Sequence, residues 1–289
     1  MRVRQRDSLP SRPSAAHRYP HYWVCSAFRS LAFGPYTQRV GERERDGRDA
    51  GWVHVAVVGL AVTPLTASDV AQRVLDAARS SAGLTVGNLN LHGAYVYHTD
   101  TDFRQYCASC DVVLIDGAPI AWLARTPMKY RVGSTDWLDA LLPQADDLRV
   151  VAIGGTPTAS HATQLHMRTT FPSVKWHGAD GYSNQRVDEA LAALIRDADI
   201  VLVGMGMPLQ EKWILRHRHL LADKVVANVG GCLDYYGGTQ SLAPRWLGAV
   251  GLEWLYRLGK SPRRLARRYL WEPILLAVLL IRRRNSMFR

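Results

Sequence analysis

Short apolar runs rich in Val, Ile and Leu alternate with amphipathic segments along most of this 289-residue sequence. The runs are typical of buried strands, and the segments between them repeat apolar residues at helical spacing. Strands that alternate with helices at this interval indicate a parallel sheet with crossover helices. The sequence therefore predicts an α/β fold with a Rossmann-like, mainly parallel sheet flanked by helices. The expected strands cover residues 84–91, 112–115, 150–153, 174–179, 200–203 and 224–228, and the expected helices cover residues 70–82, 102–110, 120–125, 137–142, 159–171 and 187–196.

Charge and composition divide the chain into three parts. Residues 1–50 hold ten Lys or Arg against five Asp or Glu and show no sustained periodicity, so we expect a disordered basic leader. Residues 51–243 form the expected α/β core, which begins at the apolar run after residue 52. Residues 245–289 hold eleven Lys or Arg against two Asp or Glu and are rich in Trp and Leu, without a strand pattern. We therefore expect residues 244–289 to form a helical, arginine-rich appendage that associates with a membrane.

The net charge of +11 lies mainly at the two ends and points to a polyanionic partner, either nucleic acid or anionic lipid. In the appendage, Arg257, Arg264 and Arg268 lie seven and four residues apart and share one side of a helix, opposite Trp, Tyr and Leu. This pattern is typical of a helix in a membrane interface, and a solvated basic face packed on the core is the alternative. The apolar run at 273–281 is nine residues long, against about 20 needed to span a bilayer. We expect a cytoplasmic protein that associates peripherally with the inner face of the plasma membrane and binds no nucleic acid.

Open α/β sheets bind ligands beyond the carboxyl ends of their strands, so polar residues at those positions are the first candidates. Asp116 directly follows the apolar run at 112–115. Burial there would raise the pKa of Asp116 toward a value useful for a general base, although Asp116 could instead cap the helix after it. Asn88 and Asn90 project the same way from an extended segment, and they could bond a sugar or cap a loop.

Three glycine-containing loops follow other expected strands. Gly154 and Gly155 precede a helix whose first N–H groups suit a phosphate, although a tight turn without a ligand fits equally. The later Gly-Met-Gly loop lacks the third glycine of a dinucleotide fingerprint, which leaves Gln210 and Lys212 as candidate nucleotide ligands. Asp234 follows a Gly-Gly pair and could supply a second carboxylate, or it could bond neighbouring backbone amides.

Several common motifs are missing from the sequence. It has no P-loop, no G-x-S-x-G and no H-E-x-x-H pattern, and neither of its Asp-x-Asp pairs follows an apolar strand. We therefore expect neither a metal ion nor a cofactor. If a diphosphate leaves during the reaction, helix termini and Arg or Lys side chains must meet its charge.

Taken in order, several motifs resemble those of the WecG/TagA/CpsF family of glycosyltransferases, family 26, over residues 53–270. They are Asp116-Gly117, Arg131-Val-Gly-Ser-Thr-Asp136, Gly204-Met-Gly-Met-Pro-Leu-Gln210-Glu-Lys-Trp213, Gly230-Gly-Cys-Leu-Asp234, and Ala243-Pro-Arg-Trp246 with Gly251-Leu-Glu-Trp254-Leu-Tyr-Arg257-Leu. The resemblance implies an inverting, metal-independent transferase. Its donor would be a UDP-sugar that carries an N-acetylmannosamine-type or related sugar, and its acceptor an undecaprenyl-diphosphate-linked sugar in teichoic acid or other cell-surface polysaccharide synthesis. The resemblance also allows a homo-oligomer.

The resemblance also assigns roles to residues. Asp116 would deprotonate the acceptor hydroxyl, and Arg257, Arg264 and Arg267 would close over the diphosphate. Arg131 and Gln210 match family positions that are expected to contact substrate, and Asn90 carries over directly. Together with the candidates outside the resemblance, the residues expected to contact substrate are Asn88, Asn90, Arg131, Gly154, Gly155, Tyr182, Gln210, Lys212 and Asp234. Asn88 departs from the threonine that is usual in the family, which bears on the choice of sugar.

Two other classes of function compete with a glycosyltransferase. A nucleotide-dependent oxidoreductase accounts for the α/β core but not for the basic tail or the broken glycine fingerprint. A basic protein that binds nucleic acid or anionic lipid accounts for the charge, but the basic residues of the tail alternate with Leu and Trp as in a membrane helix.

Overall fold

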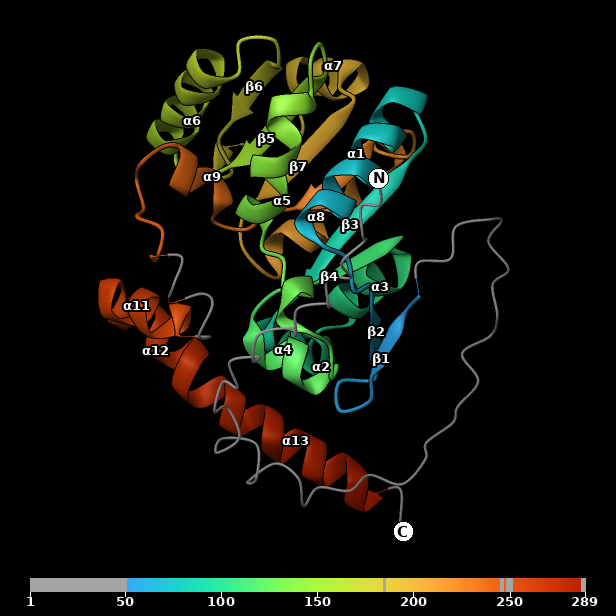
Figure 1. The fold of residues 1–289 in the computed structure, drawn as a ribbon, viewed down its shortest axis with the longest axis vertical. Coiled ribbons are helices and arrows are strands. Elements are labelled where there is room, and N and C mark those ends of the chain that lie inside the picture. The colour runs from blue at the N-terminus through green and yellow to red at the C-terminus, as the bar shows by residue number, and fades with distance from the viewer. Residues whose placement is uncertain (1–50, 184–185, 245–246, 248–251, 287–289) are drawn as a thin grey trace, which may run out of the picture. The chain divides into compact units, whose positions relative to one another are not determined.

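A computed structural model describes residues 51–183, 186–244, 247 and 252–286 of the chain, without the side chains of residues 264 and 283–286. The main sheet has six parallel strands in the order β4-β3-β8-β7-β5-β6 (Figure 1). The strands are β3 (Leu84–Leu89), β4 (Val112–Ile115), β5 (Arg149–Gly154), β6 (Lys175–Ala179), β7 (Ile200–Gly204) and β8 (Val225–Asn228). Each expected strand is present, so the predicted parallel α/β fold is confirmed.

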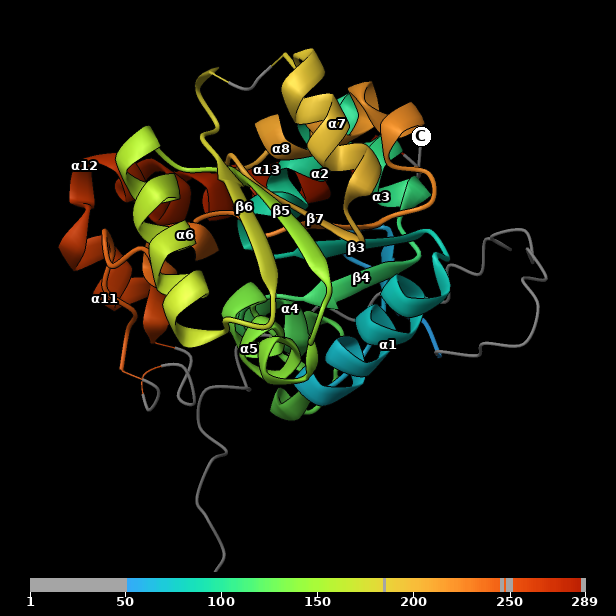
Figure 2. The ribbon, with the colours of Figure 1, turned by 90° about the horizontal axis from the view of Figure 1, so that it is seen from above.

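Helices cover both faces of this sheet (Figure 2). One face carries α1 (Ala67–Ser80), α5 (Ser134–Leu141) and α6 (Pro157–Thr170), and the other carries α3 (Thr101–Ser109), α7 (Glu189–Asp197) and α8 (Leu209–Arg216). Successive side chains of a strand point to opposite faces. Val150 and Ala152 of β5 therefore join one apolar core, whereas Val151 and Ile153 join the other.

The apolar run after residue 52 forms a separate antiparallel hairpin of β1 (Val53–Val55) and β2 (Leu60–Val62). Gly59 in its turn has a φ of 74°, a backbone conformation that glycine adopts without strain. The backbone N–H of Thr63 donates to Val113 O at 2.8 Å, which ties the hairpin to β4.

Three short helices begin directly beyond the carboxyl ends of strands. They are α2 (Leu91–Thr99), α4 (Ala118–Leu123) and α9 (Cys232–Tyr236). The first strand was expected to run to residue 91, and α2 was not predicted. The strand ends at Leu89 because Asn90 caps α2, its Oδ1 accepting from Gly93 N at 2.9 Å.

The C-terminal appendage is helical, as expected. It contains α11 (Glu253–Lys260), α12 (Pro262–Ala266), the π-helical turn η5 (Arg267–Trp271) and α13 (Glu272–Ser286). Helix α13 packs against α2, and Leu276 is buried in the core cluster that α2 shares. In the described parts of the chain, the helices are too short or too polar to cross a membrane. The expected leader, residues 1–50, lies outside the described residues.

Candidate functional site

Asp116 follows β4 at the carboxyl edge of the sheet, where the loops after β3, β7 and β8 also lie. Its backbone N–H donates to Leu89 O, at the end of the neighbouring strand β3, at 2.9 Å. Gly117, with a φ of 94°, turns the chain into α4 and is the N-cap residue of that helix. The alternative that Asp116 caps the following helix is therefore wrong.

Asn90 holds the carboxylate of Asp116. Its Nδ2 donates to Asp116 Oδ2 at 3.0 Å, while its Oδ1 accepts from the backbone of α2. The helix bond fixes which end of the amide faces Asp116, because only the oxygen can accept from Gly93 N. The structure thus brings together Asn90 and Asp116, which were predicted separately, with the amide directed at the carboxylate.

The environment of Asp116 changes its acidity. Burial raises the pKa of this carboxyl, and the hydrogen bond from Asn90 and the charges of Arg257 and Arg268 oppose that change without cancelling it. The residue as a whole keeps partial exposure to solvent. A raised pKa makes the Asp116 carboxylate a stronger base than a free aspartate side chain.

Two arginines from separate segments share one glutamate next to Asp116. A backbone bridge to Ile115 lays Arg131 beside β4, and Arg131 Nη1 lies 3.6 Å from Glu253 Oε2 of α11. Glu253 also pairs with Arg257, whose guanidinium lies 5.4 Å from the ring centroid of Tyr235 in α9. These contacts place the start of the appendage at the edge of the sheet that holds Asp116.

The other predicted arginines differ in their surroundings. Arg264 lies in α12, and its side chain is not among those that the structure describes. Arg267 is exposed at the start of η5. Arg268 is partly buried, and its Nε is shielded from solvent without a hydrogen-bond partner among the described residues. The charge of Arg268 acts on Asp116. Sequence spacing placed Arg268 on the basic side of the appendage, but not in the site.

The fully buried side chain of Gln210 forms hydrogen bonds with two loops. Its Oε1 accepts from Gly206 N at 3.2 Å and from Gly230 N at 3.1 Å, so one amide oxygen joins the loops after β7 and β8. Its Nε2 donates to Glu211 Oε1 at 2.7 Å. Gln210 was predicted to contact substrate, and in this arrangement its side chain shapes the backbone of the two loops.

Glu211, which the sequence pattern did not single out, is buried beneath these loops. Its Oε1 accepts from Asn228 Nδ2 at 2.6 Å as well as from Gln210. Glu211 Oε2 and Asn228 Oδ1 have no hydrogen-bond partner among the described residues. Burial raises the pKa of Glu211 to about 7, because the hydrogen bonds compensate only part of the loss of hydration.

Asn88 is turned into the fold. Its Nδ2 donates to Asn228 O at 2.7 Å and lies 3.4 Å from Ser134 Oγ, at the start of α5. The side chain is buried and links β3, β8 and α5. Asn88 therefore supports the carboxyl edge from below, two residues before Asn90 reaches Asp116.

The predicted glycine turn after β5 lies beside Asp234. A Cβ added to Gly154 would lie 2.3 Å from Gly204 O, so the close approach of β5 and β7 requires glycine there. A Cβ on Gly155 would lie 3.2 Å from Asp234 Oδ1, and Asp234 Oδ2 accepts from Gln240 Nε2 at 2.8 Å. Asp234 and the turn thus form one group, next to the loop after β8.

Two predicted residues lie apart from these contacts. Tyr182 is 71% exposed in the turn after β6, at the far end of the strand order from β4. Lys212 Nζ lies 2.7 Å from Asp100 Oδ2 and 3.6 Å from Asp102 Oδ2, at the start of α3. In the described parts of the chain, no group of three or more His, Cys, Asp or Glu side chains is arranged to hold a metal ion.

Comparison with known proteins gives consistent matches. The profile of the glycosyl transferase WecG/TagA/CpsF family matches residues 55–288. Similar proteins named N-acetylglucosaminyldiphosphoundecaprenol N-acetyl-beta-D-mannosaminyltransferase come from Bacillus subtilis (28% identity over 63% of this chain), Bacillus spizizenii (30% over 56%) and Staphylococcus aureus (29% over 46%). The alignments span 73%, 65% and 54% of these three relatives, respectively.

Proposed function

The chain belongs to the WecG/TagA/CpsF family of glycosyl transferases, and from this membership we propose that it moves an N-acetylmannosamine-type sugar from a UDP-sugar to an undecaprenyl-diphosphate-linked acceptor. The names of the three relatives, which specify an N-acetylmannosaminyl group and a diphosphoundecaprenol acceptor, support this choice of substrates. Membership of a transferase family also favours this function over the oxidoreductase and nucleic-acid alternatives.

The arrangement around Asp116 is the observation that carries the proposed chemistry. Asp116 removes the proton from the acceptor hydroxyl, and the oxygen attacks the anomeric carbon of the donor sugar. The bond from that carbon to the phosphate oxygen breaks, and its electron pair leaves with UDP. A single displacement of this kind inverts the anomeric configuration. The raised pKa of Asp116 suits a group that holds the proton once it is transferred.

Arginines of the appendage are proposed to neutralise the leaving diphosphate. Arg257 and Arg268 both act electrostatically on Asp116, so their positive charges lie at the reacting edge of the sheet. Guanidinium groups form bidentate bonds with phosphate oxygens and can stabilise charge as it develops. We therefore extend the proposal to a reaction that needs no divalent metal ion.

The appendage is also proposed to lie on the inner face of the plasma membrane, where a lipid-linked acceptor is held. Ile274, Val278 and Ile281 are exposed on one side of α13, and Leu270 and Trp271 are exposed just before it. Apolar side chains next to arginines are typical of helices that bind the interface of anionic membranes. Co-pelleting with anionic vesicles, but not with RNA, is the expected result.

A transfer assay tests the proposed function. The full chain is incubated with UDP-N-acetylmannosamine and a short-chain lipid diphosphate that carries N-acetylglucosamine, with and without EDTA. We expect UDP release that depends on the acceptor, a product heavier by one N-acetylhexosamine, an inverted anomeric centre by NMR and no effect of EDTA. A panel of other UDP-sugars identifies the donor. Failure of all donors with this acceptor would contradict the proposed substrates, and loss of activity in EDTA would contradict the metal-free step.

A further inference from the structure

His92 and Glu272 form a contact between parts of the chain that lie 180 residues apart. His92 Nδ1 lies 2.5 Å from Glu272 Oε2, and the side chains are only 16% and 9% exposed. Glu272 is the first residue of α13, and His92 belongs to the first turn of α2. A histidine and a carboxylate at this distance and burial form a strong hydrogen bond, whose loss leaves the other group desolvated without a partner.

His92 joins the appendage to α2 from a position two residues after Asn90, the residue that holds Asp116. Burial and the nearby charge of Arg268 lower the pKa of His92, while Glu272 and Met207 favour its protonated form.

The contact between His92 and Glu272 lies close in sequence to the arginines of the appendage. Glu272 immediately follows η5, which contains Arg268, and η5 follows α11 and α12 with Arg257. Beyond Glu272, Leu276 of α13 is buried in the core that α2 shares. Glu272 thus anchors the appendage to the core at the point between the arginines and the apolar part of α13.

We propose that His92 is a positioning residue, which docks the C-terminal appendage through Glu272 and so sets Arg257 and Arg268 beside Asp116. The catalytic consequence rests on the proposed function, whereas the docking itself does not. Because the bond between His92 and Glu272 forms only when α13 lies on α2, it links the position of the arginines to the same turn that places Asn90 and Asp116.

Amide exchange on the full chain measures the docking directly. In His92→Ala and in Glu272→Ala, we expect backbone exchange across residues 253–286 to rise at least tenfold, with exchange in β5 and β7 unchanged. The double variant should match either single variant, because both changes remove one contact. The matched control pair is Arg149→Ala and Asp199→Ala, which removes an ion pair between β5 and β7 and should leave exchange of 253–286 as it is. Unchanged exchange of 253–286 in both single variants would overturn the docking role.

Kinetics separates positioning from mere support of the fold. With donor and acceptor as above, His92→Ala should lower kcat at least tenfold and change KM for the donor by less than threefold, since the arginines act on the leaving group. His92→Asn, whose amide N–H can replace Nδ1, should restore most of kcat and slow the exchange again. A loosened appendage with an unchanged kcat would overturn the positioning role. If the unaltered chain transfers no sugar, that result counts against the proposed function, and the exchange experiment alone decides the docking.

Discussion

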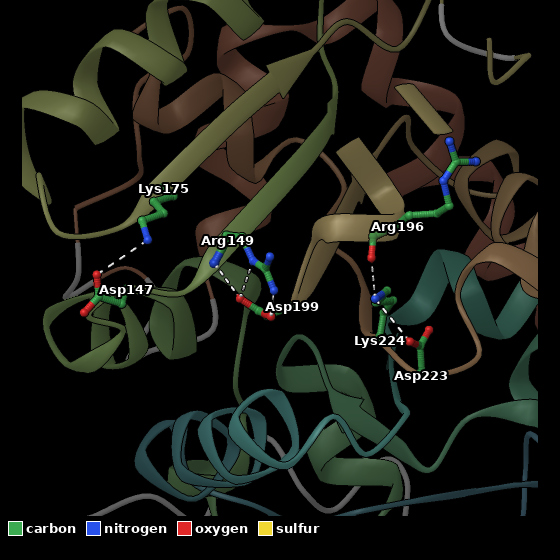
Figure 3. Close-up of polar contacts among 7 residues, drawn as sticks. All are labelled: Asp147, Arg149, Lys175, Arg196, Asp199, Asp223 and Lys224. Atoms are coloured by element: carbon green, nitrogen blue, oxygen red, sulfur yellow. Dashed lines mark hydrogen bonds and ion pairs between the residues drawn. The ribbon is translucent and has the colours of Figure 1, made fainter. Parts of the chain in front are cut away.

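The two edges of the six-stranded sheet differ in the partners of their charged side chains. At the amino edge, ion pairs join neighbouring strands and loops at the surface (Figure 3). Arg149 Nη2 lies 3.0 Å from Asp199 Oδ1 across β5 and β7, and Lys175 Nζ lies 3.7 Å from Asp147 Oδ1. Each of these charges has its partner within reach, and Arg149, Lys175 and Asp147 are half exposed or more, so the pairs contribute modestly to stability.

At the carboxyl edge, neutral amide side chains hold the carboxylates. Asp116 is held by the neutral side chain of Asn90, and Glu211 by those of Gln210 and Asn228. The positive charges that act on Asp116 come from the appendage, far along the chain. Burial disfavours the charged form of a carboxyl. Because no cation bonds directly to these two carboxyls, their pKa values are raised. The ion pairs drawn in Figure 3 thus lie at the amino edge, whereas the proposed base lies at the carboxyl edge.

Asp116→Asn should have the largest effect. The amide keeps the shape of the side chain but cannot take a proton, so we expect kcat to fall about a thousandfold with KM for the donor within about threefold of the original. Steady-state kinetics with the lipid-linked acceptor measures both. Asp199→Asn, at the amino edge, is the control and should keep full kcat. Normal turnover in the Asp116→Asn variant would remove Asp116 as the base.

Glu211→Gln tests whether the second buried carboxyl holds a proton. The folded state has a pKa of about 7 for this group against 4.5 for the free side chain, so it binds the proton more tightly than the unfolded state. Stability is then highest in acid and falls by roughly 3 kcal/mol as the pH rises from about 4.5 to about 7. The Gln variant lacks this decline and should be more stable than the original chain at pH 8.

Urea unfolding at pH 5 and pH 8 measures the change. Glu189→Gln, which alters an exposed partner of Arg196, is the control and should follow the original chain at both pH values. The same pH dependence in the original chain and in the Glu211→Gln variant would show that Glu211 is ionised throughout.

Asn90→Ala should have a smaller effect, which is visible mainly in the pH profile. Loss of the Nδ2 donor removes an interaction that lowers the pKa of Asp116, so that pKa rises further. Because the base must be unprotonated, activity falls as pH drops through this pKa, and the acid limb of kcat/KM moves to higher pH. We expect kcat to fall about tenfold at neutral pH, with about 1 kcal/mol of stability lost with the cap of α2.

Asp188→Ala is the matched control for the loss of a helix cap. Asp188 caps α7, its Oδ1 accepting from Leu191 N at 2.8 Å, and it precedes a helix that packs on a different part of the sheet from Asp116. The control should lose similar stability and keep the acid limb of the original chain. An unshifted limb in Asn90→Ala would mean that Asn90 only supports α2.

The sheet and the position of Asp116 follow from local pattern. Strand β4 is four buried apolar residues in a row, and Asp116 comes next, so its place at a strand end needs no tertiary information. Helix α2 was missed because its residues show no one-sided apolar pattern and Asn90 looks equally suited to extend a strand. The pairing of Asn90 with Asp116 depends on the register of β3 and β4, in which Leu89 faces Ile115.

Side-chain direction and long-range contacts were beyond the sequence. Gln210 was identified as a site residue, but its amide turns inward because two loop N–H groups need an acceptor there. His92 and its partner Glu272 had no signal as a pair, since their contact depends on how α13 folds back on α2. Local pattern thus locates the edge, and tertiary packing decides which of its polar groups turn into the fold.

Arg149→Ala should have the smallest effect, and it tests the amino edge of the sheet. Burial raises the pKa of Asp199, but the hydrogen bonds and charge of Arg149 outweigh it and hold that pKa below its usual value. The pair therefore stabilises the fold above the unfolded pKa of Asp199, and this contribution is lost as pH falls through the folded pKa. Since the arginine is half exposed, we expect a loss of less than about 1 kcal/mol at pH 7 in urea unfolding, reduced further in high salt, with kcat unchanged. A fall in kcat like that of Asn90→Ala would show that the amino edge also takes part in the reaction.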